Sequence, residues 1–229
     1  MIKKLSNIGD CGVVCDFGDE VNQKINAGVI KLFHFIKEEV SRGSVKGILN
    51  YTPSYNKLII NFDLKKINSS QIIDFIKSVD FSKLNFSQNK KEWIIPICYD
   101  FEMDLEDISK TLKIDKNEII NIHLNTTFYI YMVGFIPGHP FMGDLDSKLF
   151  LERLKTPRVK LPPGAVGIVE KFCNIYPYES PGGWNIIGRT PTRLFNRKDN
   201  SNPCLLSPGD SVKFKLISKK EFEKLNNEQ

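Results

Sequence analysis

The stretch GFIPGHPFMGDLD, residues 134–146, directly follows the apolar run FYIYMV, residues 128–133. It contains three glycines, two prolines and one histidine. An apolar, β-prone run that ends in Gly and Pro is typical of a strand that leads into a turn. We therefore expect a strand here, followed by a loop in which the backbone is more prominent than the side chains.

Glycine and proline stay frequent beyond this stretch. Eight of the 15 glycines and eight of the 12 prolines lie in residues 134–191, where no helical periodicity is visible. Short β-prone runs lie between the turn residues, namely AVGIVEKF (165–172), NIYPY (174–178), WNIIG (184–188) and, further on, SVKFKLI (211–217). Many short strands separated by Gly and Pro predict a small closed or nearly closed, mainly antiparallel β-barrel.

The N-terminal third has a different pattern. A short strand is expected in CGVVCDFGD (11–19), a helix over residues 20–40 and a second strand in KLIINFD (57–63). A further helix is expected in QIIDFIKSV (71–79), with Ser69 or Ser70 as its N-cap. The polar stretch KLNFSQNKKEW (83–93) reads as a linker. We predict a small α+β domain over residues 1–88 and the β-barrel domain over residues 89–229.

The barrel domain opens with WIIPICYD (93–100), a strand in which Pro96 favours an edge position or a bulge. Two short helices are predicted next, one capped by Asp104 and one capped by Asp115, with Glu118 completing a capping box. Paired short helices can form a helix-turn-helix. The second helix has one lysine, one glutamate and no arginine, so we do not expect it to bind nucleic acid.

Composition excludes several classes of protein. The net charge of +5 comes from 32 basic and 27 acidic residues spread along the chain, so no polybasic tail for nucleic acid or anionic lipid is predicted. No apolar run is long enough to cross a bilayer, and the N-terminus lacks a signal-peptide pattern. The five cysteines form no CxxC, and Cys11 and Cys15 have no partners nearby for a metal. We expect a reduced, cytoplasmic protein without a metal site, whose Cys11 and Cys15 are small buried residues of a strand.

Three loops carry the signal for a ligand: residues 134–146, TPRVKLPPGAVGI (156–168) and YPYESPGGWNIIGRTP (176–191). Glycines allow the backbone to approach a ligand, and arginines such as Arg158 and Arg189 suit carboxylate or phosphate. Trp184 and Tyr176 could form the wall of a pocket. A small anionic ligand fits this set. Gly-Pro corners of a barrel that bind nothing are the alternative.

The histidines and loop aspartates allow two interpretations. His139 is either a general base or a loop residue without chemistry, and we favour the second. His123, near the end of its predicted helix, is either an acid–base group or a residue with no functional role. Asp144 and Asp146 more often form turns than metal sites. The chain has no nucleophile elbow, Walker loop or dinucleotide fingerprint.

The three loops resemble the signature of the 5-oxoprolinase B-subunit family, which is also called allophanate hydrolase subunit 1 or KipI-like. The resemblance continues in GDCGVVCDFGD (9–19), TPSYNKLIINFD (52–63), IPICYD (95–100), the helix pair at 104–124 and LLSPGDSVKFKLI (205–217). It implies a small α/β domain followed by a cyclophilin-like β-barrel. It also implies ATP-dependent opening of 5-oxo-L-proline to L-glutamate, in a hetero-oligomer with an A-type subunit and a C-type subunit similar to allophanate hydrolase subunit 2.

The family motif can be transferred residue by residue. It implies His123, Arg158 and Arg189 as catalytic residues, with His123 the weaker candidate. The substrate-binding residues it implies are Gly134, Pro137, Gly138, Gly164, Gly182, Gly183, Trp184 and Thr190. ATP is expected to bind to the complex, Mg²⁺ being its candidate companion, and no covalent cofactor is expected. The chain alone is expected to be inactive.

The chain departs from the family pattern at two places. His139 stands where the family commonly has a large aromatic, and residues 170–174 replace a Gly-Gln-Thr-Gly run. These departures leave the exact substrate open. Two alternative functions also remain, an inhibitor of a sensor histidine kinase and a half-subunit of a biotin-dependent urea or amide carboxylase.

Overall fold

The structure, a computed structural model, describes residues 2–84 and 90–228. The chain forms two compact units, Met1–Asn89 and Lys90–Gln229. The predicted boundary between residues 88 and 89, and part of the predicted linker, fall on residues 85–89, outside the described residues. That boundary therefore stays a prediction.

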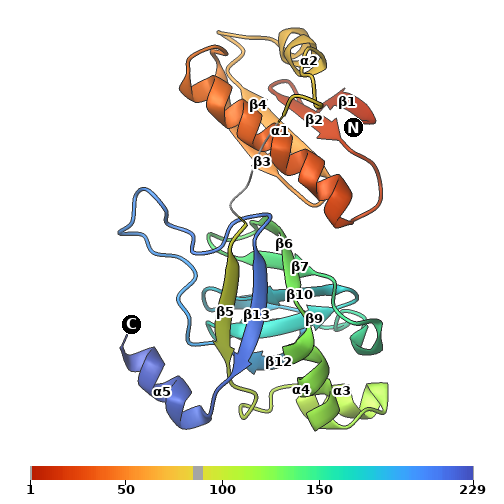
Figure 1. Cartoon of the computed structure of the whole chain (residues 1–229), viewed down its shortest axis with the longest axis vertical. Helices are drawn as coiled ribbons and strands as arrows, with labels where there is room; N and C mark the ends of the chain where they lie inside the picture. The colour runs from red at the N-terminus through yellow and green to blue at the C-terminus, as the bar shows by residue number, and fades with distance from the viewer. Residues whose placement is uncertain (1, 85–89, 229) are drawn as a thin grey trace. The chain divides into compact units, whose positions relative to one another are not determined.

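The first unit is a four-stranded antiparallel sheet, in the order β1-β2-β4-β3, with two helices (Figure 1). Its elements are β1 (Lys4–Asn7), β2 (Gly12–Asp16), α1 (Gln23–Ser41), β3 (Ile48–Pro53), β4 (Lys57–Phe62) and α2 (Ser69–Lys77). Leu58, Ile60 and Phe62 alternate along β4 and are buried in one cluster with apolar residues of both helices. Both helices therefore cover the same face of the sheet.

Two details of this unit correct the sequence analysis. Helix α2 is capped by Asn68, in a capping box with Gln71, and not by Ser69 or Ser70. Cys15 is buried, and burial raises the pKa of its thiol to about 12, whereas Cys11 is exposed. Cys11 lies just before β2 rather than inside the strand, so the alternation that buries Cys15 does not extend to it.

The second unit is built on a seven-stranded mixed sheet, in the order β12-β9-β10-β7-β6-β13-β5. Its elements are β5 (Glu92–Ile97), α3 (Leu105–Leu112), α4 (Lys116–Asn125), β6 (Phe128–Val133), β7 (Pro140–Gly143), a 3-10 turn (Ser147–Leu149), β8 (Arg158–Leu161), β9 (Ala165–Val169), β10 (Phe172–Ile175), β11 (Ser180–Gly182), β12 (Asn185–Arg189), β13 (Ser211–Leu216) and α5 (Lys219–Asn227). Strand β13 is parallel to β5, and the other pairs in this sheet are antiparallel.

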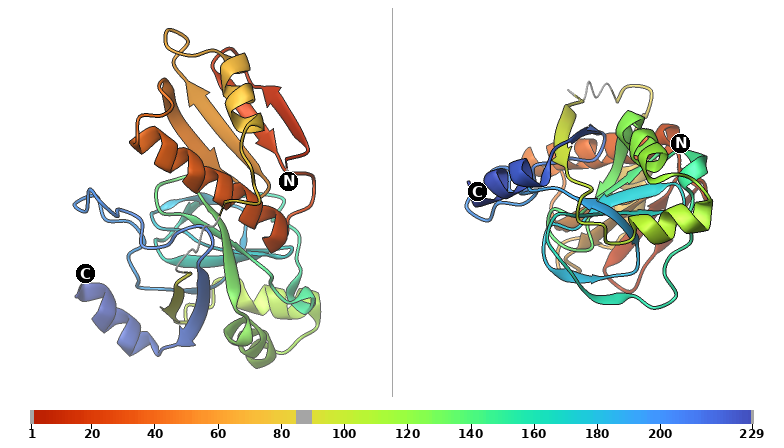
Figure 2. Two further views of the ribbon diagram at one scale, coloured as in Figure 1. Left: turned by 45° about the horizontal axis from the view of Figure 1, so that its top comes forward. Right: turned by 90° about the horizontal axis from the view of Figure 1, so that it is seen from below.

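The sheet of the second unit is nearly closed (Figure 2). Cys98, just after β5, and Arg189, at the end of β12, exchange two backbone hydrogen bonds of 2.8 Å. This bridge joins the first strand of the sheet to the last. Twenty buried apolar residues, among them Phe128, Ile168 and Phe214, fill the interior. The predicted β-barrel is thus present as a nearly closed mixed sheet.

The predicted edge position of Pro96 is confirmed, because β5 is the terminal strand of the sheet. Both predicted helices, α3 and α4, are also present. Asp115 caps α4 through the N–H of Asn117, not in the predicted capping box with Glu118. Asp104 makes no side-chain cap to α3 in the described structure, because its carboxylate is bound elsewhere in the unit. Helix α5 was not predicted.

Candidate functional site

A pocket of about 270 Å³ lies where the predicted ligand loops meet at one end of the second unit. Its walls are residues 163–164, 177–178 and 190–193, together with Phe195 and Asn226. Two of the three predicted loops therefore line it directly. Ligand pockets commonly measure about 300–1,000 Å³, so this one suits a small metabolite.

Gly164 fixes the wall of this pocket. Its φ is +79°, and a Cβ at this position would overlap the carbonyl oxygen of Thr190. The N–H of Gly164 donates to the Tyr176 carbonyl at 2.7 Å, and the N–H of Thr190 donates to the Gly164 carbonyl at 2.8 Å. Only glycine combines this backbone conformation with so close an approach. Gly164 and Thr190, both predicted binding residues, thus lie in direct contact.

The first predicted loop supports the pocket from behind. A Cβ on Gly138, whose φ is +78°, would lie 2.7 Å from Cβ of Phe195, a residue of the pocket wall. The N–H of Gly134 donates to the His139 carbonyl at 3.0 Å and closes the loop, while Pro137 is exposed at its tip. Gly134, Pro137 and Gly138 therefore shape the loop beneath the wall and do not line the pocket.

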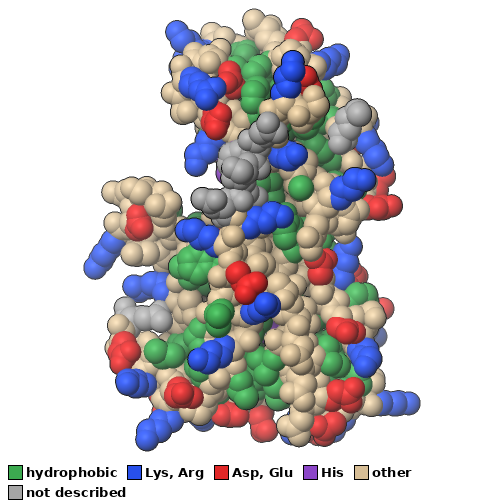
Figure 3. Space-filling model, in the orientation of Figure 1, with side chains coloured by type: hydrophobic (Ala, Val, Ile, Leu, Met, Phe, Trp, Pro, Cys, Tyr) green, Lys and Arg blue, Asp and Glu red, His purple; other side chains and the backbone are tan. Residues whose placement is uncertain are grey.

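The polar side chains of the pocket favour an anionic ligand. Tyr178, Thr192 and Asn226 contribute hydroxyl and amide groups, and Arg193 contributes a positive charge. None of the described residues that line the pocket is acidic. On the face drawn in Figure 3, basic and acidic side chains are interspersed over each unit. The pocket is therefore a polar hollow with one arginine on its wall.

Arg193 was not among the residues predicted from the sequence. The available signal was its place in the GRTPTR segment, four residues after Arg189 on the same loop. The motif drew attention to Arg189 instead, because Arg189 belongs to the GRTP string of the family signature. Arg193 is exposed and lines the pocket, as expected of an arginine that meets a soluble ligand.

Arg189 lies behind the pocket wall rather than in it. Its guanidinium lies 4.7 Å from the ring centre of Phe101 and 5.2 Å from that of Phe222. Its Nη2 donates to the carbonyl of Pro163, a wall residue, at 3.2 Å. Burial lowers the pKa of Arg189. The structure thus places this predicted catalytic residue in a cation–π contact with two aromatic rings.

Arg158 is paired with a carboxylate of the protein itself. Its Nη2 binds Oδ1 of Asp104, and Oδ2 of Asp104 accepts the N–H of Ile186 at 2.6 Å. Only 7% of the Asp104 side chain and 32% of the Arg158 side chain are exposed. Nη1 of Arg158 is buried and has no hydrogen-bond partner among the described residues. The predicted anion-binding arginine therefore already holds an anion.

Gly182, Gly183 and Trp184 lie against Tyr176, Arg153 and Phe141, respectively. A Cβ on Gly182 would lie 2.5 Å from the Tyr176 hydroxyl oxygen, and a Cβ on Gly183 would lie 2.7 Å from Nε of Arg153. The ring centre of Trp184 lies 6.0 Å from that of Phe141. These three predicted residues do not line the pocket formed by residues 163–164 and 190–193. Their glycines make room for Tyr176 and Arg153.

His139 also belongs to the group around Tyr176. Its ring stacks on Phe141 at 4.7 Å between centres and meets Tyr176 edge-on at 5.0 Å. Its Nε2 lies 3.0 Å from the amide nitrogen of Asn174. Nδ1 of His139 and Oδ1 of Asn174 are buried and have no hydrogen-bond partner among the described residues. Burial lowers the pKa of His139 to about 4.

His123 lies inside the apolar core of the second unit. It is fully buried, and its Nδ1 is 2.7 Å from the Tyr99 hydroxyl. Its Nε2 lies 3.7 Å from the sulfur of Cys173. Burial lowers the pKa of His123 to about 3. This location leaves the imidazole no path to a ligand in the pocket, although His123 lies near the end of its helix as predicted.

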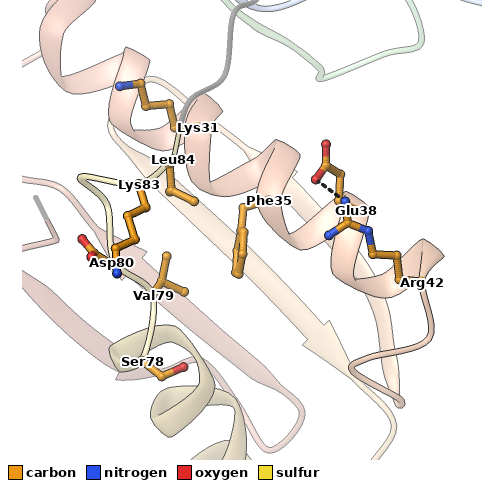
Figure 4. Close-up of a pocket in the computed structure, with 9 residues that line it drawn as sticks. All are labelled: Lys31, Phe35, Glu38, Arg42, Ser78, Val79, Asp80, Lys83 and Leu84. Atoms are coloured by element: carbon orange, nitrogen blue, oxygen red, sulfur yellow. Dashed lines mark hydrogen bonds and ion pairs between the residues drawn. The ribbon is translucent and has the colours of Figure 1, made fainter.

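A second pocket, of about 360 Å³, lies in the first unit between α1 and the segment after α2 (Figure 4). Arg42 pairs there with Glu38 at 3.3 Å, and Lys83 pairs with Asp80 at 3.4 Å. Two of the three basic side chains that line it are thus paired with acidic neighbours, and none of the predicted ligand loops contributes to it. We regard it as a less suitable site for an anion.

Two features bear on the class of protein. Over residues 2–84 and 90–228, no group of three or more His, Cys, Asp or Glu side chains is arranged to hold a metal ion. Within the same ranges, no helix combines the length and the apolar character needed to span a bilayer.

Comparison with known proteins matches residues 3–206 to the family described as carboxyltransferase domain, subdomain C and D. A protein of Bacillus subtilis (strain 168), named as the B subunit of 5-oxoprolinase, is 32% identical over 238 residues, covering 98% of this chain and 97% of that protein. A Haemophilus influenzae protein of the same name is 42% identical over 122 residues, covering 52% and 57% of the two chains.

A solved structure confirms the likeness of the fold. The crystal structure of TTHA0988 superposes with a TM-score of 0.79 at 27% sequence identity, and the match covers 91% of this chain. It covers only 40% of that protein, so the chain spans about two fifths of its length.

Proposed function

Because the chain belongs to the 5-oxoprolinase B-subunit family, within the wider family of the carboxyltransferase domain, subdomain C and D, we propose that it is the B component of an ATP-dependent 5-oxoprolinase. The single observation that carries this proposal is the near full-length similarity to the B. subtilis protein, at 32% identity. The reaction proposed is the hydrolysis of 5-oxo-L-proline to L-glutamate.

The pocket lined by Gly164 and Thr190 is our proposed substrate site. The substrate is a five-membered lactam with one carboxylate, which is small and anionic. A pocket of about 270 Å³ with Arg193 on its wall matches both properties. Arg193 would hold the carboxylate, and the hydroxyl groups of Thr192 and Tyr178 would orient the ring. Two loops of the family signature supply these walls.

Opening the lactam requires more than binding. An amide is unreactive, and phosphorylation of its oxygen by ATP would activate the carbonyl carbon for attack by water. The ring C–N bond then breaks to free the amine, and hydrolysis releases phosphate and leaves the carboxylate of glutamate. The pocket is too small for a nucleotide in addition to the lactam, and the unit has no phosphate-binding loop in its described residues. We therefore assign ATP, with Mg²⁺ as its companion, to a site outside this pocket in the assembled complex.

The partners follow from the same assignment. The relatives are named as one subunit of 5-oxoprolinase, which implies a multi-subunit enzyme, and we propose an A-type and a C-type subunit as the partners. The chain alone would bind substrate without turning it over. We further propose a cytoplasmic location and a cyclophilin-like classification for the barrel. The domain division at residues 88 and 89 remains part of this proposal.

The roles of the predicted catalytic residues are revised in this proposal. Arg189 would hold the pocket wall through Pro163, and Arg158 would brace the barrel through Asp104. His123 is assigned no proton transfer, because it is fully buried and its pKa is about 3. The glycines at 138, 164, 182 and 183 would shape the site rather than contact the substrate by side chains.

An omission assay tests this function. The chain is purified with its A- and C-type partners, and glutamate formation from 5-oxoproline and ATP is measured with each component left out in turn. We expect turnover only when all three are present. An assembled complex that leaves 5-oxoproline unchanged would refute the substrate assignment.

Two further assays test the alternative functions. Inhibition of a sensor histidine kinase by the chain alone, without turnover by the complex, would favour the regulatory alternative. Dependence on a biotin-carrying partner and bicarbonate would favour the carboxyltransferase alternative. Neither outcome is expected under the proposed function.

A further inference from the structure

Helix α5 packs on the rear of the proposed substrate pocket through one aromatic side chain. Phe222 is only 4% exposed, and its ring centre lies 4.8 Å from that of Phe101. The guanidinium of Arg189 lies over both rings. A capping box between Ser218 and Glu221 fixes the first turn of the helix. The helix is therefore firmly positioned although most of its residues are charged and exposed.

The docking of α5 brings a polar side chain to the pocket. Asn226 follows Phe222 by four residues, so the two side chains share one face of the helix. Asn226 is accordingly one of the residues that line the pocket with Gly164, Thr190 and Arg193. The next residue, Asn227, is exposed and does not line it. The pocket is thus completed by a segment far from the family's signature loops.

We propose that Asn226 recognises the lactam amide of the substrate while Arg193 holds its carboxylate. The inference rests on the proposed function and assigns a specificity-determining residue to the same pocket. It is independent of how ATP is bound, because it concerns only the edge of the ring that faces α5.

The chemistry of the two groups is complementary. A lactam holds its amide in the cis form, so its N–H and C=O point toward the same side. The side-chain amide of asparagine also carries a donor and an acceptor side by side. The two amides can therefore form a pair of hydrogen bonds, with Asn226 donating to the lactam oxygen and accepting from the lactam N–H. A second carboxylate could not satisfy the asparagine oxygen.

The test compares two neighbouring asparagines in the reconstituted complex. For Asn226→Ala we expect the KM for 5-oxoproline to rise about tenfold with kcat nearly unchanged, because neutral hydrogen bonds to the bound substrate are lost. For Asn227→Ala, the matched control, we expect the wild-type KM. Cyclopentanecarboxylate serves as a competitive inhibitor that has the ring and the carboxylate but no lactam. Its inhibition constant should be the same for wild type, Asn226→Ala and Asn227→Ala.

Two results would overturn the inference while leaving the proposed function in place. One is an active complex in which Asn226→Ala and Asn227→Ala have the same KM. The other is an equal loss of affinity for 5-oxoproline and cyclopentanecarboxylate in Asn226→Ala. That result would mean that Asn226 contributes packing and not hydrogen bonds to the lactam amide. A wild-type complex without turnover of 5-oxoproline would overturn both the function and the inference.

Discussion

Asp104 begins helix α3, yet its carboxylate turns away from the helix. It binds the guanidinium of Arg158 and the backbone N–H of Ile186, and its side chain is 7% exposed. A buried carboxylate is costly unless its charge and its lone pairs are both satisfied. Here the Arg158 guanidinium supplies the opposite charge, and the backbone of Ile186 supplies an N–H donor. Asp104 therefore ties α3 to β8 and β12.

Replacing Asp104 should show how much this tie contributes. Asp104→Ala leaves the Arg158 guanidinium partly buried without its counter-ion, and removing one partner of such a pair costs roughly 3–5 kcal/mol. We expect urea denaturation of the chain to show a loss of that order in the free energy of unfolding. Asp107→Ala, on an exposed position of the same helix, should cost about 0.5 kcal/mol or less.

Equal and small losses for the two variants would contradict the role given to Asp104. In that case the Arg158 guanidinium would be solvated well enough to need no partner. Arg158 would then again become a candidate for binding an anionic ligand.

The contacts of individual side chains, such as those of Asp104, were the part of the structure that the sequence predicted least well. Asp104 has the residue type and the position of an N-cap, so local sequence predicts a cap. Its partner Arg158 is 54 residues away, and only the folded barrel brings the two together. His123 lies near the end of its helix as predicted, but its burial could not be predicted, because it depends on Tyr99 and Cys173 from distant parts of the chain.

At the scale of elements, the pocket depends on how closely two loops approach each other. Gly164 and Thr190 are joined by a backbone hydrogen bond of 2.8 Å, and Gly164 has a positive φ. Any side chain at Gly164 would push the loops apart. The wall of the pocket is therefore set by backbone geometry, in agreement with the Gly- and Pro-rich composition of the two loops.

A pair of glycine variants separates backbone strain from this steric effect. Gly43 also has a positive φ, of +73°, but a Cβ there would have no heavy atom within 4 Å. Gly43→Ala should cost roughly 1–2 kcal/mol of stability from strain alone. Gly164→Ala should cost about 1–3 kcal/mol more, because the added Cβ overlaps Thr190. Thermal unfolding of the two variants measures the difference.

Equal destabilisation by the two alanines would contradict the close packing of Gly164 against Thr190. Substrate binding is an independent test of the packing of Gly164 against Thr190. Gly164→Ala should weaken the binding of 5-oxoproline, whereas Gly43→Ala, in the first unit, should leave it unchanged.

The strands and helices were predicted best where the apolar period was clear. Helices α1 and α2 and strands β2, β4 and β5 appear where hydrophobic spacing indicated them. Helix α5 was missed because only Phe222 and Leu225 among its nine residues are apolar, too few to show a period. Its position depends on Phe101 and Arg189, which the sequence alone could not bring together.

At the scale of the whole molecule, the predicted site divides into separate groups. Gly164 and Thr190 line the pocket, and Arg189 stands behind its wall. The residues around Tyr176 form a second group, and His123 lies in the core. Composition and the family resemblance pointed to the loops of which two line the proposed pocket. They could not say which side chains of those loops face a cavity, since that depends on the closure of the barrel.

The departures from the family pattern also become clearer at this scale. His139 and Asn174, which lie at the two places where the chain differs, are both buried and contact each other at 3.0 Å. They are separated by 35 residues in sequence, so the contact could not be read from either place alone. The two differences therefore form one local change around Tyr176 and leave the pocket at Gly164 intact.

The most direct test of the account is the KM for 5-oxoproline in the reconstituted complex when Arg193 is replaced. Arg193→Ala removes the cation that we assign to the substrate carboxylate, and Arg197→Ala removes an exposed arginine of the same segment that does not line the pocket. The account predicts a KM at least tenfold higher for Arg193→Ala, since hydrogen bonds to a charged group contribute about 1.5–3 kcal/mol, and an unchanged KM for Arg197→Ala. An active complex whose KM is the same in both variants would contradict the claim that 5-oxoproline binds in this pocket.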